Sequence, residues 1–390
     1  MHPMLKPAMR RAWRERQIIQ FGVTPAHAVS VGPVDTATGA LLERLDGTRG
    51  LPLLRDEARA MGLPDGHVDA LVTRLTAAGL LDDTRADGSA PPVLRERSGT
   101  LDRLRPDLAA LSLVHPEPGG GAHRLAARHA THVQVRGAGR VGAMVAALLA
   151  SAGVGRVDVL DGGRVEPWDV CPGGLPETSV GERRDTAARQ LVRASAPLPP
   201  PRARGGAAGD HSEPRLSLVL VCPRDGLAAY APDPVLATDW IAAGIPHLYA
   251  GVIEATGVVG PLVLPGGTAC AGCVERRQAE REPGWTRLLA QWRSGGRQRP
   301  VPACDIALAA IVAGTAAAHA LAFLDGELPA SVASRAEISP PRLDWRSRPL
   351  VPHRDCPCGA PTKSEGEHTS GSGPAHETMT EGPPSTESGP

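Results

Sequence analysis

The chain is 390 residues long, which exceeds one typical folding core and predicts two domains with connecting segments. Its 42 Lys and Arg residues balance its 42 Asp and Glu residues, so net charge gives no reason to expect nucleic acid or an acidic membrane surface as a partner. Aromatic residues make up 3% of the chain, which argues against stacking platforms for single-stranded nucleic acid, and no apolar run is expected to span a membrane.

The first 85 residues predict a small domain of strands and helices. Residues 17–31, QIIQFGVTPAHAVSV, predict two short strands around a Thr-Pro turn. Three amphipathic helical patterns follow, and the last of them ends at Gly79. Strands followed by three short helices are typical of a winged-helix-like domain, which we assign to residues 1–85. Residues 86–130 carry Gly- and Pro-rich stretches around one helical stretch and are expected to be a linker.

Residues 131–360 predict an α/β domain. Apolar strands alternate with helical stretches between 132 and about 265, which indicates a Rossmann-like, doubly wound and mostly parallel sheet with crossover helices. A long apolar helix near 304–323 is expected to cover this sheet. Residues 361–390 contain no Val, Ile, Leu or aromatic residue, so this tail is predicted to be disordered.

The stretch VQVRGAGRVGAMVAALLASAGVGRVDVLD, residues 133–161, predicts a nucleotide-binding turn. Gly137, Gly139 and Gly142 have G-x-G-x-x-G spacing between a strand and a helix, which allows a tight bend and close approach of a phosphate. Asp161 ends the next strand, where a carboxylate can accept hydrogen bonds from ribose hydroxyls. Small residues here could equally serve the packing of the helix on the sheet. The motif leaves NAD, FAD and ATP open.

Two cysteine pairs predict a metal centre. Cys270 and Cys273 in CAGC can bind one face of a tetrahedral zinc ion, and Cys356 and Cys358 in DCPCG complete four sulfurs. A closed four-sulfur site has no open position, so its predicted role is structural. The alternatives are a redox pair at CAGC, or His353 in place of one sulfur. Seven cysteines in such clusters are typical of a cytosolic metal site, and the N-terminus lacks an apolar signal core, so we predict a cytoplasmic location.

Several of these motifs, taken in order, resemble the ThiF-type adenylating family, whose members are relatives of the ubiquitin-activating enzymes. They are GAGRVG, AGVGRVDVLDGGRVEPWDV, VGERR, CAGC, the late apolar helix and CPCG, and they lie within residues 133–358. The resemblance implies ATP binding at the glycine turn and transfer of AMP to the C-terminal carboxylate of a small protein or peptide. It argues against a dehydrogenase, which would not need paired cysteines.

The resemblance assigns roles to individual residues. Asp161 matches the acid that holds the ribose, and Arg184 stands where the family has a lysine. Asp225 matches the aspartate that would hold magnesium, although it could instead cap the helix that follows. Cys304 lies where some relatives carry a thioester cysteine, but its position before an apolar helix favours a buried structural residue.

Three positions depart from the family pattern. Gly163 replaces a second acid, while Asp169 and Pro172 replace an Asn and an Arg that contact the phosphates. An aspartate facing a triphosphate is expected to repel it, and a proline offers no donor. Arg124 or Arg128 from a partner subunit could compensate, because family members often form homodimers. ATP and magnesium are therefore open as ligands, whereas structural zinc is expected.

The order of the two domains resembles the leader-peptide-binding partner proteins of azoline-forming natural-product clusters. This implies that a precursor's leader peptide adds a strand to the N-terminal sheet, with IIQFGV or AVSVG as the edge. A separate cyclodehydratase would then use ATP beside a ThiF-type domain with degenerate adenylation.

Two other functions stay open. One is a working adenylyltransferase that activates a carboxyl terminus. The other is a winged-helix regulator that senses a nucleotide, supported by the basic run of Lys6, Arg10, Arg11, Arg14 and Arg16. The third predicted helix has Arg74 as its one basic residue, which is poor for contacting phosphates and base edges. We therefore predict no nucleic-acid partner and no membrane partner.

Overall fold

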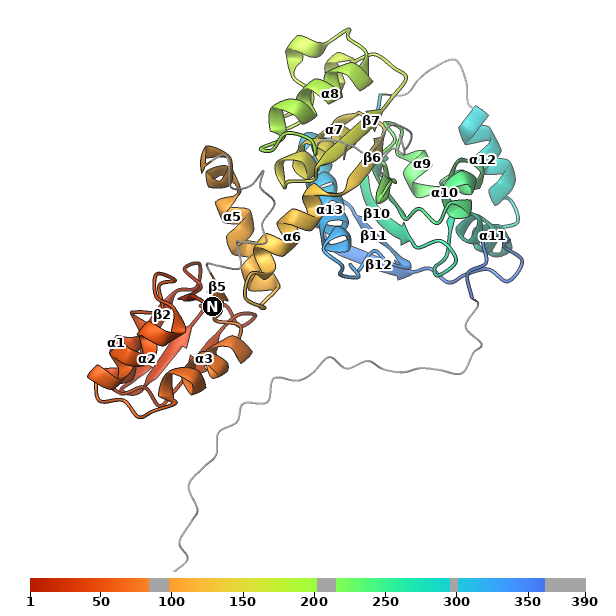
Figure 1. Ribbon diagram of the computed structural model, residues 1–390. Coiled ribbons are helices and arrows are strands. Elements are labelled where there is room, and N and C mark those ends of the chain that lie inside the picture. Colours follow the sequence, from red (N-terminus) through yellow and green to blue (C-terminus); the bar gives the residue numbers. More distant parts are fainter. Residues whose placement is uncertain (84–97, 202–214, 295–300, 362–390) are drawn as a thin grey trace, which may run out of the picture.

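The computed structural model describes residues 1–83, 98–201, 215–294 and 301–361 (Figure 1). The tail predicted to be disordered lies outside the described residues, apart from residue 361.

The N-terminal unit contains the strands and the three helices that the sequence predicts. Its strands are β1 (Pro3–Leu5), β2 (Arg11–Glu15), β3 (Ile18–Phe21), β4 (Val29–Val31) and β5 (Leu81–Asp83). Its helices are α1 (Thr36–Leu42), α2 (Leu51–Ala60) and α3 (His67–Ala77). β2, β3 and β4 form an antiparallel sheet in that order, and β1 pairs with β5.

Each helix of this unit buries one apolar stripe in a shared core. Leu41 of α1, Leu54 of α2 and Leu75 of α3 are fully buried, in one cluster with strand residues. Asp35 caps α1, because its carboxylate accepts the Thr38 amide at 2.7 Å. The helical period and the cap therefore explain why these segments fold as predicted.

Two helices occupy the segment expected to be a linker around one helical stretch. They are α5 (Ser98–Val114) and α6 (Gly120–His129). Lys6 donates to the carbonyls of Ser112 and Pro116 at the end of α5, and Asp82 accepts the Gly119 amide at 2.6 Å at the start of α6. A cation at a helix C-terminus and a carboxylate at a helix N-terminus both complement the helix dipole. These contacts dock the helix pair on the N-terminal unit.

A seven-stranded sheet forms the centre of the second unit, in the order β12-β11-β10-β9-β8-β6-β7. The strands are β6 (His132–Arg136), β7 (Arg156–Leu160), β8 (Leu218–Val221), β9 (His247–Ile253), β10 (Thr256–Val263), β11 (Ser334–Ile338) and β12 (Trp345–Pro349). β7, β6, β8 and β9 run parallel, whereas β10, β11 and β12 are joined to them by antiparallel pairing. The predicted Rossmann-like α/β fold with a mostly parallel sheet is confirmed.

Helices cover both faces of this sheet (Figure 1). The α-helices are α7 (Arg140–Ser151), α8 (Arg184–Ser195), α9 (Leu227–Tyr230), α10 (Thr238–Ala242), α11 (Ala271–Arg281), α12 (Trp285–Ser294) and α13 (Ile306–Leu324). α7, α8 and α13 share the main core with the strands, and residues of α9 to α12 form smaller clusters on the other face.

Helix α13 is more apolar than the sequence analysis expected, since no apolar run there was expected to span a membrane. With 19 residues and a mean hydropathy of 2.0, it is long and apolar enough to cross a membrane by length and composition alone. Its Leu308, Val312 and Ala316 are buried in the main core, where the helix packs on α7, β9 and β10. α13 is the expected helix that covers the sheet.

Candidate functional site

The glycine turn between β6 and α7 leaves no room for side chains. Gly137 has φ +104°, and a Cβ there would lie 2.0 Å from the carbonyl oxygen of Cys222. A Cβ on Gly142 would lie 2.1 Å from the carbonyl oxygen of Gly137. Gly139 caps the helix that follows. The glycines are thus required by the packing of the turn itself, as the motif predicts.

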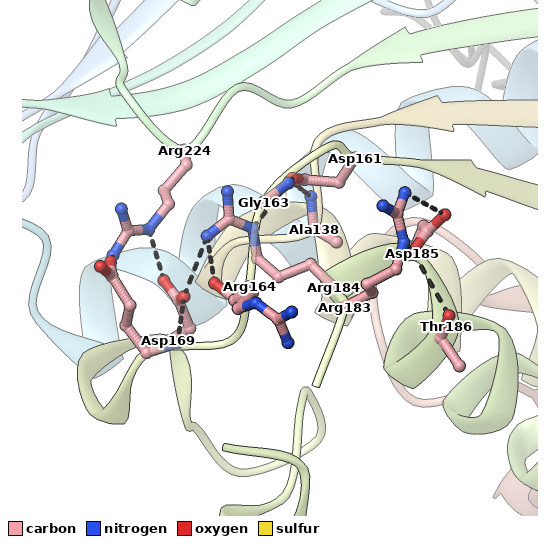
Figure 2. A network of polar contacts seen from close by, with 11 residues as sticks. Ala138, Asp161, Gly163, Arg164, Asp169, Arg183, Arg184, Asp185, Thr186 and Arg224 are labelled. Atoms are coloured by element: carbon pink, nitrogen blue, oxygen red, sulfur yellow. Dashed lines mark hydrogen bonds and ion pairs between the residues drawn. The ribbon is translucent and has the colours of Figure 1, made fainter. Parts of the chain in front are cut away.

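Asp161 binds the turn from the end of β7 (Figure 2). Its carboxylate accepts hydrogen bonds from the Ala138 amide, the Gly163 amide and Arg184 Nε, each at 2.9 Å. A carboxylate has about four lone-pair positions, so one is left for a further donor such as a ribose hydroxyl. The described contacts of Asp161 stabilise the turn, and its predicted role toward a ribose stays a prediction.

Arg184 fills the place where the family has its second acid. Its Nη1 donates to the Arg164 carbonyl at 2.6 Å and lies 3.5 Å from Asp169 Oδ2. A Cβ on Gly163 would lie 2.0 Å from Arg184 Nη2. Gly163 and Arg184 are therefore a matched pair, since a side chain at 163 would displace the guanidinium from Asp161.

Asp169 is buried among cations instead of facing a triphosphate directly. Its Oδ1 accepts a hydrogen bond from Arg224 Nε at 2.6 Å, and its Oδ2 accepts one from the Glu166 amide at 2.9 Å. Its side chain is 3% exposed and also pairs with Arg184. The simple like-charge repulsion expected from the sequence is therefore offset by two guanidinium groups.

Arg224 is the residue of this site that the sequence reasoning missed. It follows β8, pairs with Glu166 and Asp169, and lies over the glycine turn, where a Cβ on Gly139 would be 3.1 Å from Arg224 Cγ. The signal was its position directly before Asp225, at the carboxyl end of a parallel strand, where ligands of such sheets bind.

The remaining candidates make local contacts. Asp225 Oδ1 accepts the Leu227 amide at 3.0 Å just before α9, although the N-cap of that helix is Gly226, and the capping and magnesium roles of Asp225 both stay predictions. Arg128 forms a buried pair with Asp325 at 2.5 Å within this chain, and a role for it or for Arg124 toward a partner subunit stays a prediction. Burial raises the pKa of Cys304 to about 11, as expected for a structural residue and unlike an activated nucleophile.

All four predicted metal ligands meet in one cluster. The Sγ atoms of Cys270, Cys273, Cys356 and Cys358 lie within 4.8 Å of one another, with contacts of 3.9, 3.6 and 3.5 Å. Four sulfurs bound tetrahedrally at about 2.3 Å from zinc would be separated by about 3.8 Å. The start of α11 supplies the first pair and the C-terminal segment the second. The donor set and its spacing fit a closed zinc site.

His353 is a buried neighbour of this cluster, neither a fourth ligand nor a solvated residue. Its Nε2 lies 2.9 Å from Glu280 Oε1, and its Nδ1 accepts the Asp355 amide at 3.1 Å. Hydrogen bonds from the Cys270 thiol and from the His353 backbone amide lower the pKa of Cys273, which favours the thiolate that a metal requires.

Comparison with known proteins decides the family. The model of the ThiF family matches residues 117–360, which include the glycine turn and all four clustered cysteines. The chain is a member of the ThiF family. No curated protein matches it.

Solved structures similar to this ThiF-family protein include E. coli MccB with AMPCPP and MccA, at a TM-score of 0.65 and 16% identity, covering 93% of this chain and 100% of that one. The microcin C7 biosynthetic enzyme MccB with N-formylated MccA gives a TM-score of 0.62 and 15% identity, with coverage of 92% and 100%. PaaA gives 0.64 and 16%, with coverage of 88% and 98%. Since coverage of the chain reaches 93%, the similarity extends into the residues before 117. At these identities it shows the fold alone.

Proposed function

We propose that this ThiF-family protein binds the leader segment of a precursor peptide through its N-terminal unit and supports the ATP-dependent modification of that peptide, with degenerate adenylation of its own. The observation that carries the proposal is an open sheet edge at β4 beside α3. The similarity to MccB structures that contain MccA supports it.

The order β2-β3-β4 selects between the two edges that the sequence offered. IIQFGV forms β3, the central strand, so it is not available to a peptide and that expectation is wrong. AVSVG contains β4, which is an edge strand. β4 is short, as edge strands often are, and the extended backbone of a leader peptide can add to it.

The register shows which residue of β4 offers its backbone. Gly22 donates to the Arg10 carbonyl at 2.8 Å, so its backbone groups point toward β2. Because successive residues of a strand direct these groups to opposite sides, those of Phe21 point toward β4, where Phe21 pairs with Val29. Ser30 therefore directs its own N–H and C=O away from the sheet, as free partners for a peptide strand.

Helix α3 borders this edge. Arg74 Nη1 donates to the carbonyl of Gly32, directly after β4, at 3.2 Å, and the Arg74 side chain is exposed. The edge strand β4 is thus followed by a cation that can contact an acidic residue of a bound peptide.

The contacts at the glycine turn support the proposal that this chain binds the peptide while another protein uses ATP. Asp161 and Asp169 pair with Arg184, and Asp169 also pairs with Arg224, so phosphates that bind to these two guanidinium groups would have to separate ion pairs. ATP chemistry by a separate cyclodehydratase is consistent with this arrangement. The cyclodehydratase and a homodimer both stay predictions.

The four-cysteine cluster completes the proposal. We assign it to zinc with a structural role, because it joins the C-terminal segment to α11 and leaves no ligand position for substrate.

The test of peptide binding is a change at Ser30 in the full chain. A fluorescently labelled candidate leader peptide is titrated, with anisotropy as the readout. Ser30→Pro should weaken binding about tenfold or more, because it removes the outward N–H, and Ser30→Ala should not. Matching melting temperatures would show that both variants are folded. Unchanged affinity in Ser30→Pro would contradict the proposed edge.

A second candidate, an active adenylyltransferase, is favoured by the two guanidinium groups of Arg184 and Arg224 beside the turn. These groups could replace the donors lost at Asp169 and Pro172. Pyrophosphate exchange into ATP in the presence of the peptide distinguishes the two functions. Exchange that Arg224→Ala abolishes would establish the adenylyltransferase, and a flat trace with intact leader binding would support the proposal.

A further inference from the structure

A cavity lies on the opposite side of the sheet from α7, α8 and α13, and residues of α9, α11, α12, β11 and β12 line it. We infer that this cavity binds an organic carboxylate with an apolar or aromatic body. The inference does not depend on the proposed function, because none of the cavity residues belongs to the glycine turn or to the N-terminal unit.

Two arginines that line the cavity lie directly opposite each other. Arg335 of β11 pairs in register with Arg348 of β12. Like charges at directly opposed positions of a sheet are unfavourable, and an anion between them relieves the repulsion. Glu337, two residues along β11, neutralises only part of this charge, with its Oε1 2.9 Å from Arg335 Nη2.

Arg335 also carries an unsatisfied buried donor. Its side chain is 9% exposed, and its Nη1 donates to the Tyr230 carbonyl at 2.9 Å. The guanidinium lies 4.2 Å from the centre of the Tyr230 ring, which orients it. Its Nε is buried and has no acceptor among the described residues. Buried donors are rarely left unpaired, and Glu337 Oε1, which also has no partner in hydrogen-bond geometry, lies against Nη2 of the same guanidinium, so the Nε–H is left for an acceptor of a bound ligand.

The other cations of the cavity leave further donors for an anion. Arg281 and Arg348 are exposed and have no ion-pair partner in the described parts of the chain. Arg277 is used, because it donates to the carbonyls of Val351 and Pro352 at 2.9 and 2.8 Å. A planar carboxylate can accept two parallel hydrogen bonds from a guanidinium fork.

The walls of the cavity explain why the ligand needs an apolar body. Trp285 and Leu289 of α12 line it and are buried, and Val274 of α11 lines it as well. Sites of this kind combine an apolar surface with a few polar groups that fix the orientation of the ligand. An inorganic anion would leave the apolar wall without a partner.

Calorimetric titration of the full chain tests the inference with three probes: 3-phenylpropanoate, its neutral amide, and inorganic phosphate. The acid should bind with one site, and the amide and phosphate should bind at least tenfold more weakly. Arg348→Gln should weaken the acid about tenfold, because it removes one charged donor at an exposed position where folding is not at risk. Arg342→Gln, with an arginine outside the cavity that is 85% exposed, is the matched control and should bind as the wild type does.

Three results with the wild-type chain would overturn the inference. They are the absence of saturable binding by the acid, equal binding of the acid and the amide, and equal binding of the acid and phosphate. Unchanged affinity in Arg348→Gln would also overturn it, since the opposed arginines would then not form the site.

Discussion

Asp169→Asn introduces the amide that the resemblance to the ThiF-type pattern predicts at this position, and it removes the buried negative charge between Arg184 and Arg224. The side chain keeps its shape, and its amide oxygen can still accept the Glu166 amide, which donates to Oδ2 at 2.9 Å, while its NH2 group replaces the acceptor that faces Arg224 Nε. The charge attraction to Arg224 Nε, 2.6 Å from Oδ1, is lost together with the weaker contact to Arg184. The substitution therefore isolates the charge from the volume.

The expected loss of stability depends on which carboxylate partner each arginine retains. Removing one partner of a buried ion pair typically lowers the free energy of unfolding by about 3–5 kcal/mol, since a charge is left uncompensated. Here Arg184 retains Asp161 and Arg224 retains Glu166, so we expect a loss of roughly 2 kcal/mol. For a domain of this size that corresponds to a melting temperature lower by roughly 4–8 °C.

Nucleotide affinity should change in the opposite direction. With the Asp169 carboxylate gone, the donors of Arg184 and Arg224 that faced it can donate to phosphate oxygens, and each charge-assisted hydrogen bond contributes about 1.5–3 kcal/mol. Calorimetric titration with MgATP should therefore show affinity increased about tenfold or more relative to the wild type.

The control for both measurements is Asp344→Asn. Asp344 pairs with Arg342 on the surface, where the two side chains are 61% and 85% exposed, so its loss should change the free energy of unfolding by less than about 0.5 kcal/mol. If Asp169→Asn melted with the wild type, the network would not stabilise the fold. If it bound MgATP no more tightly, Asp169 would not be what opposes the nucleotide.

Two further predictions concern the cysteines. Cys270→Ser should remove the stoichiometric zinc, as measured by elemental analysis, and lower the melting temperature, because metal binding and folding are linked. Cys304→Ser, the control, should keep the metal. Wild-type protein that contains no zinc after purification without chelator would refute the assignment. Burial raises the pKa of Cys304 to about 11, so this thiol should stay protonated at pH 8 and react with iodoacetamide about a hundredfold more slowly than glutathione. The rate should rise only as the pH approaches 11. Rapid labelling of Cys304, measured by peptide mapping, would indicate an activated thiolate instead.

The sequence was a good guide wherever the signal was local. The glycine spacing placed the turn at Gly137 to Gly142, and the helical periods placed α1, α2, α3 and α13. The two cysteine pairs predicted one cluster although they are more than 80 residues apart in the chain, because closely spaced cysteines are typical of the ligands of a zinc ion. These features depend on residues close together in the chain, whose geometry the local backbone sets.

Tertiary structure alone decided which groups meet at the turn and which strand is exposed. Asp169 and Arg224 are 55 residues apart and meet because β8 lies beside β6 in the sheet, so the position of Arg224 at the end of a strand did not reveal its partner. The sequence offered β3 and β4 equally as edges, and the order of pairing made β3 central. The sequence predicted a linker around α5 and α6, because Lys6 and Asp82, whose hydrogen bonds hold these helices on the N-terminal unit, lie in another part of the chain. Contacts of this kind follow from how distant segments cross in space, which the periodicity of any one segment does not encode.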